Sequence, residues 1–279
     1  YEHGSALDET VPNPFYQYLT SERFPGSLRN QETIALSELL RPYPHYGGLH
    51  VAYSPDRRSR YQALQISVRR PHLNGYSFLF GYNYNREREE EYFDAVASYL
   101  NEFELQDSDE PRHRLSAAGI YELPFGGERA YLSSLHPVLD ALVGGWQMSG
   151  AFYFNSGRYL RFGPVLVDGD PAPDTPTPDR WFDTSKFQQQ PAFTPRSNPW
   201  QYSGLTGPVY WNLDGTLTKQ FRLRGGARVE LKLAAYNVTN RLNREMPVTS
   251  VLDPNFGRTL RQLNGTTGRQ LELGLKVLF

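Results

Sequence analysis

The stretch RQLELGLKVLF, Arg269–Phe279, closes the sequence with a strand pattern. Polar or small residues at Glu272, Gly274 and Lys276 alternate with apolar ones, which are Leu271, Leu273, Leu275, Val277 and Phe279. Alternation with a period of two predicts a β-strand with one apolar and one polar face. Chain ends usually fray, so a terminal strand this regular implies that both of its faces are occupied.

Six other stretches have the same period. In Arg60–Arg70 the pattern places Leu64, Ile66 and Val68 on one face, and in Tyr76–Arg86 one face is strongly aromatic. The seven predicted strands lie near residues 60–70, 76–86, 113–123, 146–156, 211–221, 229–240 and 269–279. Each has roughly ten residues, the length with which a tilted strand crosses the hydrocarbon of a bilayer.

The connections between these strands alternate in length. The tighter ones are 71–75, 124–145 and 222–228, and the longer ones are 87–112, 157–210 and 241–268. In an up-and-down meander this alternation gathers the long loops at one end. Outer-membrane barrels have that asymmetry, with long loops outside the cell and short turns in the periplasm. Residues 1–59 are expected to be mainly an extracellular loop.

Some connections contain local patterns. Helical spacing predicts a helix in 89–103, after the acidic run Glu89–Glu91, and a shorter one in Glu32–Leu40. A helix of one or two turns is expected within 124–145, with Pro137 near its start and Gly144 just past its end. The Pro-rich, acidic stretch Asp168–Asp179 is expected to be an exposed, irregular loop.

Composition fits this interpretation. The 279 residues carry a net charge of −1, a hydrophobic fraction of 39% and a mean hydropathy of −0.59. No run approaches the ~18 apolar residues of a membrane helix, but membrane strands average to a polar score. The balanced charge argues against a nucleic-acid binder. The absence of cysteine excludes a disulfide framework, a thiolate metal site and a cysteine nucleophile.

The predicted fold is therefore all-β, a transmembrane antiparallel up-and-down β-barrel segment of about seven strands. Four aromatic residues near predicted strand ends, Tyr76, Tyr121, Trp146 and Trp211, suit the girdles at the membrane interfaces. A closed barrel leaves no free sheet edge in lipid. We expect the edges at Arg60–Arg70 and Gln270–Phe279 to pair with strands outside these residues.

Signals for chemistry are weak. GxSxG, HExxH, P-loop and GxGxxG motifs do not occur. The six histidines are scattered, and the pair Asp168 and Asp170 lacks the ligand spacing of a calcium loop. Asp107, Asp109 and Glu110 share one loop, whereas a glycosidase opposes two carboxylates across a cleft. We predict no catalytic residue, no cofactor and no metal site.

Several motifs resemble a known family. The terminal strand with its final Phe279 resembles the signal that the bacterial barrel assembly machinery reads, with Leu271, Leu273, Leu275 and Val277 as its apolar positions. Other stretches are similar to the C-terminal barrel of TonB-dependent receptors of the Oar-like group, whose full members carry a carboxypeptidase-regulatory-like domain. These stretches are VPNPFY (11–16), LLRPYPHYGG (39–48), YQALQISVRR (61–70), YELPFGGER (121–129), GGWQMSGAFYFNSGR (144–158), WFDTSKF (181–187) and AAYNVTNRLN (234–243).

This resemblance implies a barrel of about 22 strands around a plug, of which residues 1–279 supply about seven strands and lack the plug, the TonB-contacting segment and a signal peptide. It implies location in the bacterial outer membrane and a role in the wall and extracellular loops of a nutrient uptake channel. The implied partners are outer-membrane lipid, the assembly machinery, an unidentified substrate, and the TonB complex through the plug. Nucleic acid is not among them.

Two other classes remain open from the residues alone. One is a secreted β-sandwich that binds carbohydrate through its aromatic side chains, and the other is a soluble glycoside hydrolase. Both would stay in solution without detergent, whereas a barrel would fractionate with the outer membrane.

Overall fold

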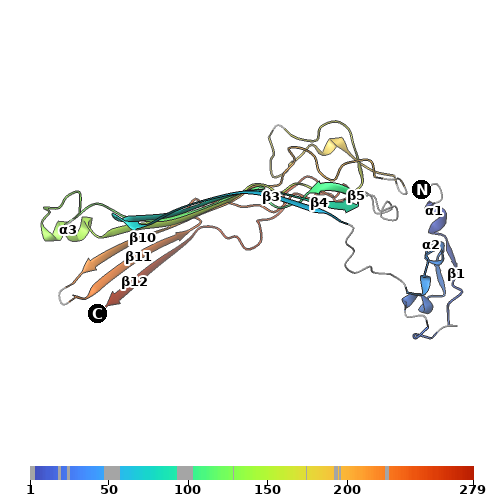
Figure 1. The fold of residues 1–279 in the computed structure, drawn as a ribbon, viewed down its shortest axis with the longest axis horizontal. Coiled ribbons are helices and arrows are strands. Elements are labelled where there is room, and N and C mark those ends of the chain that lie inside the picture. The colour runs from blue at the N-terminus through green and yellow to red at the C-terminus, as the bar shows by residue number, and fades with distance from the viewer. Residues whose placement is uncertain are drawn as a thin grey trace.

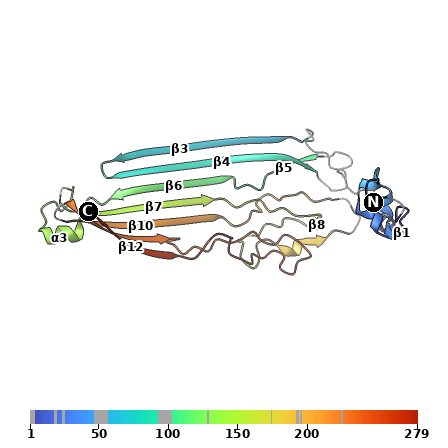
Figure 2. The ribbon, with the colours of Figure 1, turned by 90° about the horizontal axis from the view of Figure 1, so that it is seen from below.

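A long antiparallel sheet dominates the computed structural model, which describes residues 4–17, 20–23, 26–46, 57–92, 103–127, 129–173, 175–191, 194, 196–223 and 226–279 (Figures 1 and 2). Seven strands follow one another across it in chain order: β3 (Ser59–Leu73), β4 (Tyr76–Tyr92), β6 (His113–Glu122), β7 (Trp146–Asn155), β10 (Tyr210–Arg222), β11 (Arg228–Tyr236) and β12 (Gln270–Leu278). A short strand, β5 (Phe103–Asp107), pairs with the far half of β4. The described strands thus form an up-and-down meander.

Each of the seven predicted strands is present. Most boundaries agree within a few residues, but β4 continues to Tyr92 and β11 ends at Tyr236. The extension of β4 has a clear cause, because its last residues pair with β3 on one side and with β5 on the other.

The register aligns the apolar sides of all seven strands. Leu64 lies opposite Tyr84, Phe152 opposite Leu213, and Leu217 opposite Leu233, which in turn faces Leu273. Successive residues of a strand point to opposite faces, so these pairs form one continuous surface, the apolar face. Leu64, Phe80, Leu217 and Leu273 belong to it, as predicted.

The same register brings polar side chains together on the opposite surface, the polar face. Gln65 lies opposite Asn83, which faces Arg114, and Thr216 lies opposite Ala234, which faces Glu272. Ser67, Asn83, Thr216 and Lys276 all belong to this face, as predicted. A single sheet with one apolar and one polar face is the arrangement of a barrel wall between lipid and a polar lumen.

The predicted sorting of connections is confirmed. Asn74 and Gly75 join β3 to β4 with φ of 56° and 83°, the positive values that a tight type I′ hairpin turn requires. The turn from β10 to β11 and the connection from β6 to β7 lie at this same end, the turn end (Figure 2). The latter connection contains α3 (Pro137–Val143), which begins with a proline and is followed by Gly144, as predicted.

The longer connections meet at the opposite end of the sheet, the loop end (Figure 2). The helix predicted over 89–103 is wrong in its first part, since Glu89–Glu91 lie in β4 and pair with β5. Backbone hydrogen bonds on both sides of β4 outweigh the local helical spacing there. Residues 93–102 lie outside the described part of the chain.

The N-terminal residues form a small unit of their own. It contains α1 (Gly4–Leu7), β1 (Thr10–Pro12), η1 (Ser27–Asn30), β2 (Thr33–Ala35), α2 (Leu36–Leu39) and η2 (Pro44–Tyr46). Leu28 and Ile34 are buried at its centre. The helix predicted over Glu32–Leu40 is limited to α2, because Thr33–Ala35 pair with β1 instead. In the described residues no helix is long and apolar enough to cross a membrane.

The outermost strands, β3 and β12, each have one neighbouring strand among the described residues. Their outer backbone groups form the two edges of the sheet. These are the two edges that the sequence predicts, at residues 60–70 and 270–279.

Candidate functional site at the loop end of the sheet

Three connections converge at the loop end into one assembly, called the cap here and defined as residues 103–112, 157–209 and 241–268 (Figure 1). Most of it is irregular. Its regular elements besides β5 are β8 (Val165–Val167), η4 (Thr184–Lys186) and β9 (Phe187–Gln189), and β8 pairs with β9.

An aromatic core holds the cap together. Phe162 and Phe182 are 1% and 0% exposed, and their ring centroids lie 5.2 Å apart in an edge-to-face arrangement. Phe187 stacks on Phe162 at 4.8 Å, and Phe256 from the third connection contacts Phe187 at 5.3 Å. Aromatic pairs of this geometry stabilise beyond the area they bury, so two connections far apart in sequence share one core.

Backbone hydrogen bonds also join the second connection to the third. The amide of Trp181 donates to the carbonyl oxygen of Gly257 at 2.7 Å, and the amide of Thr259 donates to that of Pro178 at 2.8 Å. The stretch Asp168–Asp179 is irregular and largely exposed, as predicted. Pro171, however, is fully buried, which anchors this stretch to the core.

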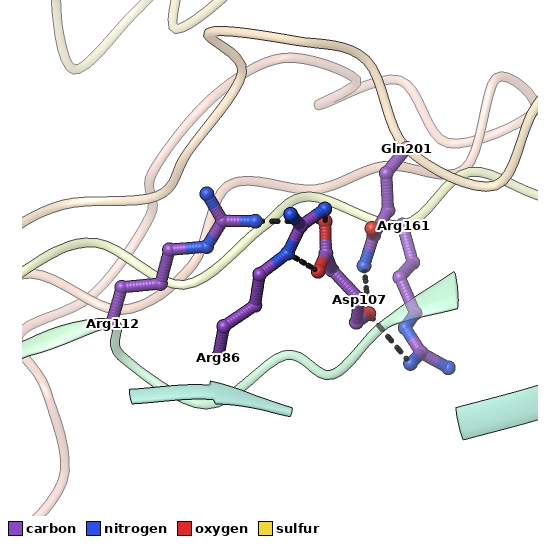
Figure 3. Close-up of polar contacts among 5 residues, drawn as sticks. All are labelled: Arg86, Asp107, Arg112, Arg161 and Gln201. Atoms are coloured by element: carbon purple, nitrogen blue, oxygen red, sulfur yellow. Dashed lines mark hydrogen bonds and ion pairs between the residues drawn. The ribbon is translucent and has the colours of Figure 1, made fainter. Parts of the chain in front are cut away.

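Asp107 joins the first connection to the second (Figure 3). Its carboxylate accepts hydrogen bonds from Arg86 at 2.9 Å and from Arg112 at 2.7 Å. Its backbone carbonyl oxygen accepts hydrogen bonds from Arg161 at 3.4 Å and from Gln201 at 2.6 Å. One residue at the end of β5 therefore contacts side chains from three separate parts of the chain.

Arg196 is a second polar anchor, buried at 5% exposure. Its Nε donates to the carbonyl oxygen of Asn198 at 2.9 Å, and its guanidinium lies 3.8 Å from the centroid of the Trp200 ring. The side chain of Asn198 in turn accepts a hydrogen bond from the amide of Val165 at 3.1 Å. These contacts fix residues 196–200 against β8.

A pocket of about 310 Å³ lies beside this anchor. Its wall combines one carboxylate, one ammonium group, two side-chain amides and two hydroxyls with apolar surface. The lining residues are Leu166, Val167, Asp168, Gly169, Lys186, Gln188, Ser197, Asn198, Pro199 and Tyr202. Burial raises the pKa of Tyr202, whose hydroxyl is a hydrogen-bond donor. Pockets with a few polar groups on an apolar wall suit small polar ligands.

A second pocket, of about 470 Å³, lies on the polar face of the sheet. It is lined by both polar and aromatic side chains, including Gln65, Asn83, Arg114, Tyr153 and Tyr210. Arg114 and Tyr210 belong to strand ends at the loop end of the sheet. The polar face is thus hollowed close to the cap.

The predicted interfacial aromatics lie at both ends of the sheet. Tyr76 pairs with Tyr121 at the turn end, and Trp146 lies at the same end opposite Lys219. Trp211 lies at the loop end opposite Phe154. These positions agree with two girdles, and membrane contact of these rings stays a prediction.

The predicted assembly signal lies on β12. Leu271, Leu273 and Leu275 are 69%, 80% and 67% exposed on the apolar face, and Val277 follows them there. Phe279 lies just beyond the strand and is fully exposed. Recognition of this strand by assembly machinery stays a prediction.

The carboxylates and histidines weighed for chemistry are dispersed. Asp107 is bound by two arginines, and Glu110 pairs with Arg114. His72 contacts Glu122 at the turn end, whereas His113 contacts Tyr82 on the sheet. Across the described ranges no three histidine or acidic side chains come together in a way that could hold a metal ion.

Three residues organise the structure in ways not anticipated from the sequence, where Asp107 is considered only as one of three neighbouring carboxylates and Arg196 and Lys219 are not singled out. The links made by Asp107 and Arg196 depend on contacts between distant loops, which carry no local signal. Lys219 does have a local signal in the sequence, because it occupies the next apolar position after Trp211, Leu213, Gly215 and Leu217. It is 3% exposed, and its ammonium group donates a hydrogen bond to the carbonyl oxygen of Gly144.

Comparison with known proteins identifies the class. The family model of the outer membrane beta barrel domain matches residues 5–272. The chain belongs to this family. As an outer membrane beta barrel domain it is located in the bacterial outer membrane. No curated protein and no solved structure matches the chain.

Membership in this family, together with the single sheet, overturns the β-sandwich alternative. A sandwich needs a second sheet packed against the apolar face of the first. In the described residues the seven long strands all belong to one sheet, and its apolar face is exposed.

Proposed function

We propose that this outer membrane beta barrel domain is part of the barrel of a TonB-dependent receptor of the Oar-like group, with the cap on the outside of the cell. In this proposal it forms part of the wall and the extracellular loops of a nutrient uptake channel. It performs no bond chemistry.

The observation that carries the proposal is the cap. Two of the three long connections share an aromatic core, and Asp107 joins the other one to them, so the loop end is a folded surface with a defined pocket. Loops positioned on a rigid scaffold commonly carry binding function. A barrel used only as an open pore would not need a preformed pocket in its long connections.

The sheet also supports a larger assembly. In lipid each unpaired backbone group costs several kcal/mol, and β3 and β12 each present one free edge among the described residues. Bacterial single-chain barrels have an even number of strands. We propose that strands outside residues 1–279 pair with both edges and close a barrel of about 22 strands, as the resemblance implies.

The proposed partners follow from this arrangement. Outer-membrane lipid covers the apolar face, and the barrel assembly machinery recognises β12 through Leu271, Leu273, Leu275, Val277 and Phe279. The TonB complex acts on a plug that lies outside residues 1–279. The substrate enters through the cap, where Lys186, Asp168 and Tyr202 offer a cation, an anion and a hydroxyl in one pocket.

Growth on a panel of limiting nutrients tests the proposal. A strain that lacks this protein should grow poorly on one nutrient class, and loss of TonB function should cause the same defect. Restoring the intact protein should rescue growth only in cells with active TonB. The TonB proposal fails if no nutrient requires both components, while the membership in the barrel family would be unaffected.

A further inference from the structure

The connection between β6 and β7, residues 124–145, presents an apolar outer surface. Val138, Leu139 and Leu142 on α3 are 65%, 50% and 63% exposed. Phe125, Tyr131 and Leu132 of the same connection are exposed as well. Contiguous exposed apolar side chains mark an interaction surface, so this connection needs an apolar partner.

The inner side of α3 is polar and fixed. Asp140 lies on the side of the helix opposite Val138 and Leu142, and its carboxylate accepts a hydrogen bond from the amide of Gly127. A Cβ atom at Gly126 would lie 2.5 Å from the Cα atom of Gly144, so the backbone packs closely here. The helix therefore cannot rotate to bury its leucines against the rest of the protein.

Two contacts place this connection against the apolar face of the sheet. Trp146 donates from Nε1 to the carbonyl oxygen of Leu142 at 2.9 Å, and Lys219 donates to that of Gly144. Trp146 and Lys219 face each other across β7 and β10 in the register of the apolar face. The connection thus continues the lipid-facing surface at the turn end, where Figure 1 shows α3.

Lys219 places a positive charge on the apolar face of the sheet, and the connection shields this charge from lipid. Its ammonium group lies 5.5 Å from the ring centroid of Trp146 and 5.0 Å from that of Phe221. A bare cation on a lipid-facing strand is costly. Gly144 and the two rings replace lipid around this cation, and the outer surface of the connection then meets the lipid.

We propose that residues 124–145 form a foot that rests in the phospholipid leaflet at the turn end, the periplasmic leaflet. Val138, Leu139 and Leu142 lie among the acyl chains, as the apolar side of an interfacial helix does. Arg70 lies opposite Phe78 in the register of the apolar face at the same end, and we expect its guanidinium to meet the lipid phosphates. The inference depends on membrane location and on the orientation of the sheet, and is independent of TonB or transport.

Spin labelling tests this foot, because residues 1–279 contain no cysteine, and any cysteine elsewhere in the full-length protein is replaced by serine first. Leu139→Cys and Leu142→Cys are labelled in the full-length protein in isolated outer membranes, and Asp179→Cys in the cap is the water-exposed control. Oxygen concentrates in lipid, and a charged nickel complex stays in water. The ratio of oxygen to nickel accessibility should be several-fold higher at positions 139 and 142 than at 179.

Two results would overturn the proposal. Equal nickel accessibility at all three positions would place the foot in water. Protection of positions 139 and 142 from both reagents would show that protein, not phospholipid, covers it. Heat-modifiable migration confirms that each labelled variant is folded, and Val138→Cys repeats the measurement from a neighbouring position.

Discussion

Gln201 donates a hydrogen bond of 2.6 Å to the backbone carbonyl oxygen of Asp107, although the two residues are 94 positions apart. The contact joins the connection after β4 to the connection after β7. The carboxylate of the same aspartate binds Arg86 and Arg112. Asp107 is thus the residue on which the cohesion of the cap is most readily tested.

Asp107→Asn should loosen the cap and leave the sheet intact. The variant removes a partly buried charge between two arginines and should cost the cap about 1–2 kcal/mol. Faster chymotrypsin cleavage next to Phe103 and Leu105 on whole cells measures this effect, because the carboxylate holds Arg86 and Arg112, whereas the backbone carbonyl oxygen that binds Arg161 and Gln201 is kept in the variant. Glu110→Gln is the matched control, because its pair with Arg114 is 44% exposed on both sides and should contribute about 0.5 kcal/mol or less. Equal cleavage of both variants would argue against the role of Asp107.

Phe162→Ala should unfold the cap core. The side chain is 1% exposed and contacts the rings of Phe182, Phe187 and Tyr202, so its loss should cost about 3–5 kcal/mol. Leu252→Ala is the control, since Leu252 is 70% exposed in the third connection and its loss should change stability by about 0.5 kcal/mol or less. Hydrogen exchange of the cap amides measures the difference. Unchanged protection in Phe162→Ala would contradict a shared core.

Leu273→Arg should damage folding far more than Lys276→Arg. Leu273 is 80% exposed on the apolar face, where an arginine near the bilayer centre costs about 2–4 kcal/mol. Lys276 lies on the polar face opposite Glu230, and its replacement keeps the charge. Urea titration of the full-length protein in lipid vesicles compares the two variants. Similar losses of stability would reverse the assignment of the faces.

The proposed orientation, with the cap outside the cell, predicts different labelling at the two ends of the sheet. A membrane-impermeant maleimide should react with Asp179→Cys on intact cells, because this cap side chain is 82% exposed. Leu223→Cys, in the turn between β10 and β11, should react only after the outer membrane is permeabilised. Reaction of Leu223→Cys alone on intact cells would show the opposite topology.

Residues 1–279 expressed alone should collect as insoluble material. The free edges of β3 and β12 and the exposed apolar face favour edge pairing and aggregation in water. No heat-modifiable monomer is expected in detergent. A soluble, monodisperse product with a cooperative melting transition would contradict the proposal that other strands complete the barrel.

The sheet was largely predictable from the sequence, because period-two alternation and tight turns are local signals. Leu271–Val277 and Tyr76–Tyr84 define their faces without any knowledge of neighbouring strands. Asn74-Gly75 and Pro137 with Gly144 mark turn and helix ends through backbone preferences alone. Such features depend on a few adjacent residues, and all of them are present in the structure.

The cap was not predictable in the same way. Phe162 meets Phe256, and Asp107 meets Gln201, only after the sheet has brought three connections to one end. The acidic run Glu89–Glu91 was misassigned to a helix because pairing with β5 is a long-range interaction. The pocket beside Tyr202 likewise depends on the buried Arg196, whose partners are mostly backbone carbonyl groups without a sequence signature.

The unequal strand lengths have a consequence for access from the surroundings. At about 3.3 Å per residue, the 17 residues of β4 span ~56 Å and the 10 residues of β6 span ~33 Å. Because β4 and β6 are paired from the turn end, the extra residues of β4 extend past β6 at the loop end. With the strand tilt of about 40° found in membrane barrels, β4 rises ~43 Å along the membrane normal, which exceeds the ~30 Å hydrocarbon layer. In the proposed orientation, a molecule approaching from the medium meets this protein rim before it reaches the plane of the lipid.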